Sequence, residues 1–379
     1  MEGVHLIKVM YVVSNLVDAG PTRQLLYLLK NIDRQRIQPV ILKLSSEVTD
    51  SMENEFSAIG IKIINLNSKI RRPLFKKFKL MKKIVNEERP QIIHTFGYRS
   101  VYYVSRLKLA ECKRIAAFRD HPREELILTF GKIIGTFFSW HYTKLSEKMD
   151  ALTSCSYTLQ ERLLKEMGVV STAIPNGVDQ ERFFPLNMKK DLRDRLLLPI
   201  DKTIFISVGR IVTLKNYDFL CRMWDECIHE SLLVIIGDGP MLDTLKEKYK
   251  TSHSRILFLG KKNNIEEYLN AADYYVSSSL TEGLPNSVLE ALAVGLPVLL
   301  SDIPAHKELF DNGYDIGCLY KNNNSEDFVN KYHALLEKNY SDLSENSLKV
   351  VSKYYSVRRN AEEYEKLYFE LVGNVSKEH

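Results

Sequence analysis

Two glutamates, Glu282 and Glu290, carry the clearest chemical signal in the sequence. They belong to the stretch from Ser277 to Ser301, in which a loop rich in glycine and proline leads into a helix pattern. Eight positions separate them, so Glu282 falls in the loop and Glu290 about one helical turn beyond Asn286, where the helix should begin. Carboxylates accept hydrogen bonds from sugar and ribose hydroxyl groups, so the pair is suited to hold one extended, hydroxyl-rich ligand at two points.

The backbone between the two glutamates is suited to another part of such a ligand. The N–H groups of Gly283 and Leu284, together with the N-terminus of the following helix, form a favourable site for a pyrophosphate or for partial negative charge on a sugar. The alternative is a pair of solvated acids around a helix start, with no ligand.

Two cations, Arg210 and Lys215, follow the apolar run Ile204 to Val208, which is typical of a buried strand. Cations in the loop between a strand and a helix can neutralise a diphosphate. Where a nucleoside diphosphate leaves, negative charge develops on its β-phosphate, and preorganised cations there lower the barrier without a metal. A solvated surface pair is the alternative.

The first half of the chain offers weaker candidates after two of its expected strands. Gly20 opens a helix pattern, and because it lacks a Cβ it allows a phosphate to approach the backbone; the alternative is an ordinary turn and helix cap. Asp120 follows the strand that ends at Phe118, and we select it to orient or deprotonate an acceptor hydroxyl. His121 competes for that role because imidazole titrates near neutrality, and a structural role for either residue stays open.

Positive charge is concentrated between Lys69 and Lys83, a segment without acids whose apolar residues recur at helical spacing. A basic amphipathic helix of this kind suits anionic lipid headgroups or a lipid diphosphate. The residues selected for membrane contact are Arg71, Arg72, Lys76, Lys77 and Lys79. The alternative is a helix packed on the core with a solvated basic face. A second, aromatic patch from Phe130 to Tyr142 is interpreted as core or as the wall of an acceptor channel rather than as a membrane anchor.

The elements that must position these residues alternate between short Val- and Ile-rich runs and helix patterns. This is the pattern of βαβ units, in which a parallel sheet is covered on both faces by helices. One series runs from Leu6 to Ser154 and an independent one follows Pro185, so the sequence predicts two doubly wound α/β domains. We expect an N-terminal acceptor-side domain over residues 1–184, a donor domain over 185–351 and a helical tail over 352–379.

Composition excludes several other classes of protein. Of the 379 residues, 45% are hydrophobic and 27% are charged, as in ordinary soluble globular proteins. No apolar run approaches the roughly 20 residues of a membrane-spanning helix, and the N-terminus lacks a signal-peptide pattern. We therefore expect a cytoplasmic protein, with peripheral attachment to the inner face of the cell membrane as the further option raised by the basic segment. The net charge of +5 is too small to indicate nucleic-acid binding, and the five scattered cysteines indicate neither disulfides nor a structural zinc.

Several motifs together resemble the retaining glycosyltransferases of family four, whose fold of two Rossmann-like domains is called GT-B. They occur in the family's usual order: IPNGVDQERFFP (Ile174 to Pro185), SVGRIVTLKN (Ser207 to Asn216), IIGDGP (Ile235 to Pro240), AAD (Ala271 to Asp273) and EGLPNSVLEALAVGLPVLLSD (Glu282 to Asp302). They cover most of the C-terminal half. The loop around Gly20 departs from the family, which typically has two glycines there and often a glutamate.

The resemblance implies roles for individual residues. Glu282 would contact the donor sugar, Glu290 the ribose, Arg210 and Lys215 the diphosphate, and Lys261 the region of the nucleobase. It also implies a tail that packs back on the first domain, and transfer with retention of anomeric configuration from a UDP- or GDP-linked sugar, with no metal and no cofactor.

By the same resemblance the acceptor would be a lipid-linked saccharide or an oligosaccharide in bacterial surface polysaccharide or glycolipid synthesis. A nucleotide-sugar epimerase on the same fold and a catalytically silent sugar-nucleotide-binding subunit remain alternatives.

Overall fold

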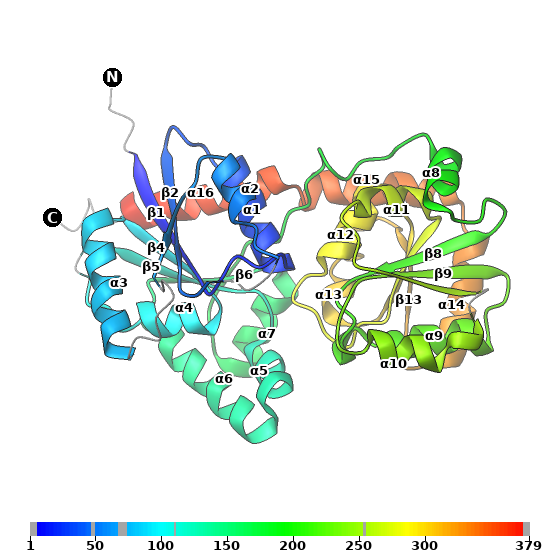
Figure 1. Ribbon diagram of the computed structural model, residues 1–379, viewed down its shortest axis with the longest axis horizontal. Coiled ribbons are helices and arrows are strands. Elements are labelled where there is room, and N and C mark those ends of the chain that lie inside the picture. Colours follow the sequence, from blue (N-terminus) through cyan, green and yellow to red (C-terminus); the bar gives the residue numbers. More distant parts are fainter. Residues whose placement is uncertain (1–5, 47–49, 67–73, 110, 253–254, 374–379) are drawn as a thin grey trace. The chain divides into compact units, whose positions relative to one another are not determined.

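The computed structural model describes residues 6–46, 50–66, 74–109, 111–252 and 255–373. These residues form two compact units, each drawn in Figure 1 around its own sheet. Unit 1 contains the chain up to Gly177 together with the C-terminal segment from Val357, and unit 2 contains Val178–Ser356. Arg71 and Arg72, two of the residues selected for membrane contact, lie outside the described residues.

Unit 1 is built on a parallel sheet in which seven strands are described, in the order β3-β2-β1-β4-β5-β6-β7. Strands β1, β2 and β4 are buried along most of their length because helices cover both faces of the sheet. Their bounds are β1 (Ile7–Val13), β2 (Ile37–Lys43), β3 (Lys62–Asn65), β4 (Ile92–Phe96), β5 (Lys113–Phe118), β6 (Ala151–Ser154) and β7 (Thr172–Ala173).

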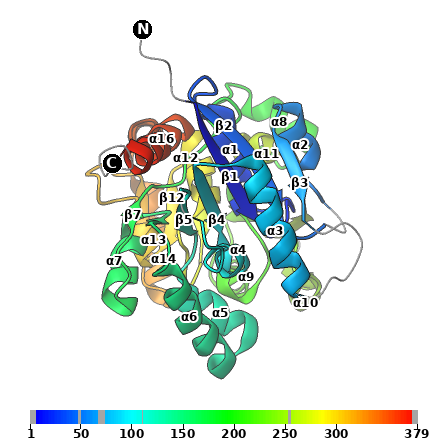
Figure 2. The same ribbon diagram turned by 90° about the vertical axis from the view of Figure 1, so that its left-hand side faces the viewer.

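The helices of unit 1 fall into two groups that bury opposite faces of this sheet. One core lies beneath α1 (Gly20–Asn31), α2 (Glu53–Ala58) and the C-terminal helix α16 (Val357–Gly373). The other lies beneath α3 (Leu74–Glu88) and α4 (Gly97–Val104). The remaining helices are α5 (Pro122–Phe130), α6 (Lys132–Ser146) and α7 (Tyr157–Met167). Figure 2 shows α5 and α6 extending away from the sheet as a helical hairpin.

Helix α16 belongs to the core of unit 1 although it follows unit 2 in the chain. Tyr364 and Tyr368 of this helix are buried in the core of unit 1, and the Tyr368 hydroxyl lies 2.8 Å from Nδ1 of the buried His94. Burial lowers the pKa of His94 well below its ordinary value, so this imidazole is neutral.

Unit 2 repeats the architecture with six described parallel strands in the order β10-β9-β8-β11-β12-β13. The strands are β8 (Thr203–Val208), β9 (Ser231–Ile236), β10 (Ile256–Gly260), β11 (Tyr274–Ser277), β12 (Val298–Ser301) and β13 (Gly317–Tyr320). The helices are α8 (Lys189–Leu196), α9 (Tyr217–Glu226), α10 (Leu242–Lys248), α11 (Ile265–Ala271), α12 (Asn286–Ala293), α13 (Pro304–Lys307), α14 (Ser325–Glu337) and α15 (Tyr340–Tyr354), with 3₁₀ turns η1 (Thr213–Lys215) and η2 (Lys250–Ser252). A parallel sheet collects the loops that follow its strands at one edge, which places Lys215 and Glu282 at the same edge.

The boundaries between the units differ by a few residues from those expected at 184/185 and 351/352. The chain enters unit 2 after Gly177, because Arg182 pairs with Glu266 and Phe183 is buried. It leaves unit 2 after Ser356, since the carbonyl of Tyr355 accepts a hydrogen bond from the N–H of Val178.

Helix α3 resolves the two interpretations of the apolar stripe in the basic segment. Met81, Ile84 and Val85 are buried in the core of unit 1, and Phe78 packs against it. The apolar face therefore covers the sheet and is not presented to a membrane, while Lys76 and Lys79 point to solvent and Lys77 is half-buried. No helix within the described ranges combines the length and apolar character needed to cross a membrane.

Candidate functional site

Lys215 and Glu282 meet at the edge of the unit 2 sheet. Lys215 ends η1, the turn that follows β8, and Glu282 lies in the loop that follows β11. The Lys215 ammonium donates a hydrogen bond to Oε1 of Glu282, and the Ser279 hydroxyl donates to the same oxygen at 2.7 Å. The Glu282 side chain is only 12% exposed, so this is a largely desolvated, charge-assisted pair.

The charge of Glu282 is maintained despite its burial. Burial by itself would raise the pKa of this carboxyl, but the ammonium of Lys215 and the hydrogen bond from Ser279 hold that pKa below its ordinary value. Glu282 is therefore a carboxylate at neutral pH, with a second oxygen available to accept a hydrogen bond from a ligand hydroxyl.

His306 on α13 is a neighbour that the sequence reasoning missed. It is fully buried, and its Nδ1 lies 2.8 Å from the carbonyl oxygen of Ser301, so Nδ1 carries the hydrogen. Burial lowers the pKa of His306 to about 4, although the Glu282 carboxylate opposes this shift. The imidazole is thus neutral, and its Nε2 is a buried atom without a hydrogen-bond partner in the structure. Only the folded chain could reveal it, because His306 lies outside the glycine-rich loop.

Glu290 lies one turn into α12, as its spacing from Asn286 predicts. Its side chain is half-buried, and no side chain caps the N-terminus of this helix. Beneath the helix, the Tyr275 hydroxyl lies 2.8 Å from the Ser287 hydroxyl, and burial raises the pKa of this tyrosine. The loop residues Gly283 and Leu284 are both buried, so the chain before α12 is fixed by packing.

Arg210 is exposed in the loop after β8. The GDGP turn, residues 237–240, packs against that loop. The N–H of Ile211 donates to the carbonyl of Asp238 at 2.8 Å. Gly237 and Gly239 have φ of +151° and +157°, and a Cβ at either would collide with the carbonyl of Gly209 or Ile211. The turn therefore has a structural role. Lys261, which follows β10, is also exposed.

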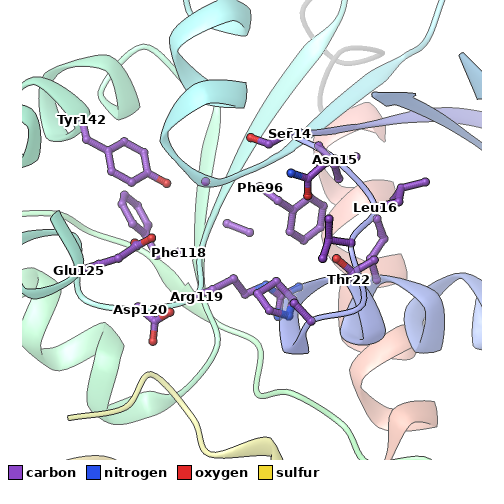
Figure 3. A pocket seen from close by; sticks show the side chains of 17 residues that line it. Ser14, Asn15, Leu16, Thr22, Phe96, Phe118, Arg119, Asp120, Glu125 and Tyr142 are labelled. Carbon is purple, nitrogen blue, oxygen red and sulfur yellow. The ribbon is translucent and has the colours of Figure 1, made fainter. Parts of the chain in front are cut away.

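Unit 1 contains a separate pocket of about 220 Å³ at the edge where β1, β4 and β5 end (Figure 3). Asp120 lines it, together with Arg119, Glu125 of α5 and Tyr142 of α6. The loop after β1 and the start of α1 form the facing wall, and the further lining residues include Ser14, Asn15, Leu16, Ala19, Pro21, Thr22, Phe96 and Phe118.

The pocket separates the two candidates for contact with an acceptor. Asp120 lines it, whereas His121 is not among its lining residues. His121 is buried at the N-terminus of α5, with Nε2 3.4 Å from a carboxylate oxygen of Glu166 on α7. Burial lowers the pKa of His121. Gly20 is also absent from the pocket wall, although its neighbours Ala19 and Pro21 belong to it.

Arg119, which the sequence analysis did not select as a site residue, also lines the pocket. Its guanidinium donates to Oδ1 of Asn176 at 2.5 Å and lies over the ring of Phe96. These contacts hold a fixed positive charge in the wall of the pocket.

Comparison with known families covers both units. Residues 19–182 match the family model described as Glycosyltransferase Family 4, and residues 188–350 match that of Glycosyl transferases group 1. The chain belongs to the family 4 glycosyltransferases. The first match lies almost wholly within unit 1 and the second lies within unit 2, so each unit is matched by one of the two models.

Curated relatives of this glycosyltransferase share its length. It is 28% identical, over 88% of the chain and 89% of the relative, to the Escherichia coli UDP-Gal:alpha-D-GlcNAc-diphosphoundecaprenol alpha-1,3-galactosyltransferase. It is 22% identical, over 93% and 98%, to the Escherichia coli O-antigen biosynthesis glycosyltransferase WclY.

Solved structures share the fold. Sucrose-phosphate synthase from Thermosynechococcus elongatus superposes with a TM-score of 0.80 at 17% identity, covering 97% of this chain and 100% of that one. HepE from Anabaena, in complex with UDP and glucose, gives 0.79 at 15% identity, covering 95% and 99%. The two-sheet architecture of this glycosyltransferase is GT-B, as the sequence motifs predict.

Proposed function

We propose that this glycosyltransferase transfers a hexose from a UDP-sugar, with retention of configuration and without a metal, to a hydroxyl group of a lipid-diphosphate-linked saccharide. The reaction would serve the assembly of a bacterial surface polysaccharide or glycolipid. The observation that carries the proposal is the Lys215–Glu282 pair, which joins a cation and a carboxylate at the edge of the unit 2 sheet.

The chemistry of a nucleotide sugar fits the charges of this edge. In the proposed complex Lys215 and Arg210 stabilise the charge that grows on the leaving diphosphate, and Glu282 accepts a hydrogen bond from a hydroxyl of the transferred sugar. Glu290 accepts hydrogen bonds from the ribose, while the region of Lys261 lies near the base. The leaving diphosphate takes the acceptor proton on the face at which the new bond forms, so the anomeric configuration is retained and no enzyme nucleophile is needed.

The acceptor assignment draws on two supports. The relative from Escherichia coli is named for transfer to a GlcNAc-diphosphoundecaprenol, a lipid-linked diphosphate sugar. In unit 1 the pocket combines the acid Asp120, the fixed cation Arg119 and aromatic walls, which suits a saccharide that carries a diphosphate. Asp120 is the residue proposed to orient the acceptor hydroxyl.

A two-step experiment tests the proposal. Thermal-shift titration with UDP, GDP and their sugars identifies the donor, and UDP should stabilise the protein more than GDP. The protein is then incubated with that donor and a short-chain GlcNAc-diphosphate lipid, with and without EDTA, and the anomeric configuration of the product is read by NMR.

Each part of the proposal has its own contrary result. An inverted product would exclude retention, and loss of turnover in EDTA would exclude metal independence. Epimerised UDP-sugar formed without acceptor would point to an epimerase, and binding of a donor without any turnover would point to a silent binding subunit.

A further inference from the structure

The hairpin formed by α5 and α6 exposes large apolar side chains on its outer face. Ile133 is 87% exposed, and Phe137 and Trp140 are each 57% exposed. We call this surface the hairpin patch; its members are Leu128, Phe130, Ile133, Ile134, Phe137 and Trp140. The prediction that the aromatic segment from Phe130 to Tyr142 belongs to the core is thus wrong for Phe130, Phe137 and Trp140, whereas Tyr142 is buried and lines the pocket.

The exposed apolar residues of α6 are not the ones that pack the helix against α5. The inner face of α6 is complete: Gly135, Ser139 and Tyr142 are buried there. A Cβ at Gly135 would collide with the backbone of Leu126 and Ile127, so α5 and α6 are packed as closely as backbones allow. Helix α6 therefore carries large apolar side chains on its solvent face although its packed face is filled, which is unusual for a helix that faces water.

Aromatic contacts give the hairpin patch a defined shape. The ring centroids of Phe137 and Trp140 lie 6.0 Å apart, and those of Phe130 and Phe138 lie 5.4 Å apart. The exposed Lys132 and Lys144 flank it along α6. Aromatic rings with an adjacent basic residue are the composition found where proteins meet the interface of a bilayer.

Two continuities indicate which partner this surface fits. The first is with the pocket, since Glu125 of α5 and Tyr142 of α6 line it while the outer faces of the same helices carry the hairpin patch. If the pocket holds the saccharide of a lipid-linked acceptor, a step that rests on the proposed function, the exposed apolar face of the same two helices is open to the lipid.

The second continuity is with positive charge. Helix α4 packs on α6 through Tyr98 and Phe138, whose ring centroids lie 5.6 Å apart, and on α3 through Tyr103 and Phe78, at 4.9 Å. The exposed lysines of α3 thus belong to the same layer of helices as the hairpin patch. An anionic bilayer offers an apolar interior and negative headgroups together, and it complements both surfaces.

We infer that the hairpin patch is the surface by which this glycosyltransferase docks on an anionic lipid bilayer. Phe137, Trp140 and Ile133 enter the headgroup and acyl boundary, and the lysines of α3 add electrostatic attraction. The α3 segment, the membrane contact expected from sequence, becomes the auxiliary part of the surface.

The protein carries its own probe for this test. Of its two tryptophans, Trp140 lies in the hairpin patch and Trp224 is fully buried in unit 2. Vesicles of phosphatidylglycerol and phosphatidylethanolamine should shift the Trp140 emission to shorter wavelength, and brominated lipids should quench it. The variant Trp224→Phe isolates the signal, and phosphatidylcholine vesicles serve as the uncharged control.

Variants separate the docking surface from the chemistry. Ile133→Ser and Phe137→Ser should each weaken vesicle binding at least tenfold, because the lost apolar area is what enters the bilayer. Leu164→Ser, at a 55% exposed position on α7, is the matched control and should bind as wild type. All three should bind UDP normally and should turn over a water-soluble acceptor normally, while the first two lose activity on an acceptor embedded in vesicles.

Unchanged vesicle binding in Ile133→Ser and Phe137→Ser would overturn the inference. The inference would also be overturned if the wild-type protein formed a dimer that did not bind vesicles and that these two variants dissociated. A second copy of the chain would then cover the patch. Intact vesicle binding without any sugar transfer would instead remove the proposed function and leave the docking surface in place.

Discussion

The ammonium of Lys215 donates a hydrogen bond to the carboxylate of Glu282, which lies 67 positions further along the chain. The loops that carry these two residues follow β8 and β11, which are adjacent strands of the unit 2 sheet. A cation and an anion are therefore paired in the candidate donor site, and replacement of either removes the charge partner of the other.

The cations should matter more for turnover than for folding. Lys215→Ala and Arg210→Ala should each lower kcat about 100- to 1,000-fold, because losing one preorganised contact to a developing charge costs about 2.7–4 kcal/mol of barrier. Lys215→Ala should also raise the pKa of the buried Glu282, since its main stabilising charge is lost. Steady-state kinetics with the identified donor measures the effect, and Lys250→Ala, at an exposed lysine, is the control. Near-normal rates in both variants would remove the diphosphate assignment.

The two glutamates should have separable effects. Glu290→Gln should weaken binding of free UDP about tenfold, because a hydrogen bond to a charged group contributes about 1.5–3 kcal/mol. Glu282→Gln should leave UDP binding unchanged and lower turnover of the complete UDP-sugar. Isothermal titration with UDP and kinetics with the donor distinguish the two, and the reverse pattern would mean that their roles are exchanged.

In unit 1 the pocket predicts different outcomes for adjacent residues. Asp120→Asn should lower kcat while leaving UDP binding and thermal stability near wild type, because Asp120 lies in the pocket wall. His121→Gln should lower the melting temperature and spare kcat, since His121 is buried against α7. If His121→Gln abolished turnover in a folded protein, the histidine rather than the aspartate would be the acceptor-side residue.

His306 should make the stability of unit 2 depend on pH. The unfolded histidine binds a proton near pH 6.5 and the folded one only near pH 4, so the unfolded chain holds more protons between these values. Stability is complete above pH 6.5 and falls as the pH drops toward 4, by about 3 kcal/mol in total. Denaturant unfolding of wild type and His306→Gln at pH 7 and pH 4.5 measures the difference. His94 and His121 remain in both proteins. An equal loss of unfolding free energy between pH 7 and pH 4.5 in wild type and His306→Gln would therefore show that His306 does not titrate this way.

The basic face of α3 should contribute electrostatic attraction to the membrane. Each basic residue near an anionic surface contributes about 1 kcal/mol, so replacing Lys76, Lys77 and Lys79 together by Ser should weaken binding to anionic vesicles about 100-fold at low salt. Binding by wild type should also decrease in high salt, as the Debye length falls. The matched control replaces three exposed lysines of unit 2, Lys246, Lys248 and Lys250. If co-sedimentation of the α3 variant equalled that of wild type, the hairpin patch alone would account for docking.

Sequence alone determined the fold and much of the donor-side chemistry. Strand and helix patterns have local causes, so two doubly wound domains could be predicted, and the motif around Glu282 and Glu290 is contiguous in the chain. The loops that carry Lys215 and Glu282 could be expected to meet because the ends of parallel strands share one edge.

Only the tertiary structure decided which residues share an environment across long separations. Burial and the charge of Glu282 set the protonation of His306, and neither can be read from a lone histidine in a helix pattern. Asp120 and His121 are adjacent in sequence and competed for one role, yet Asp120 lines the pocket and His121 is buried against Glu166 of α7.

The hairpin patch shows the same limit most clearly. Apolar residues at helical spacing are identical in sequence whether they cover a sheet or face water. In α3 they cover the sheet, and in α6 the close packing of Gly135 against α5 turns Ile133, Phe137 and Trp140 outward. Which face of a helix is buried depends on the element packed against it, and that element is fixed by the fold of the whole unit.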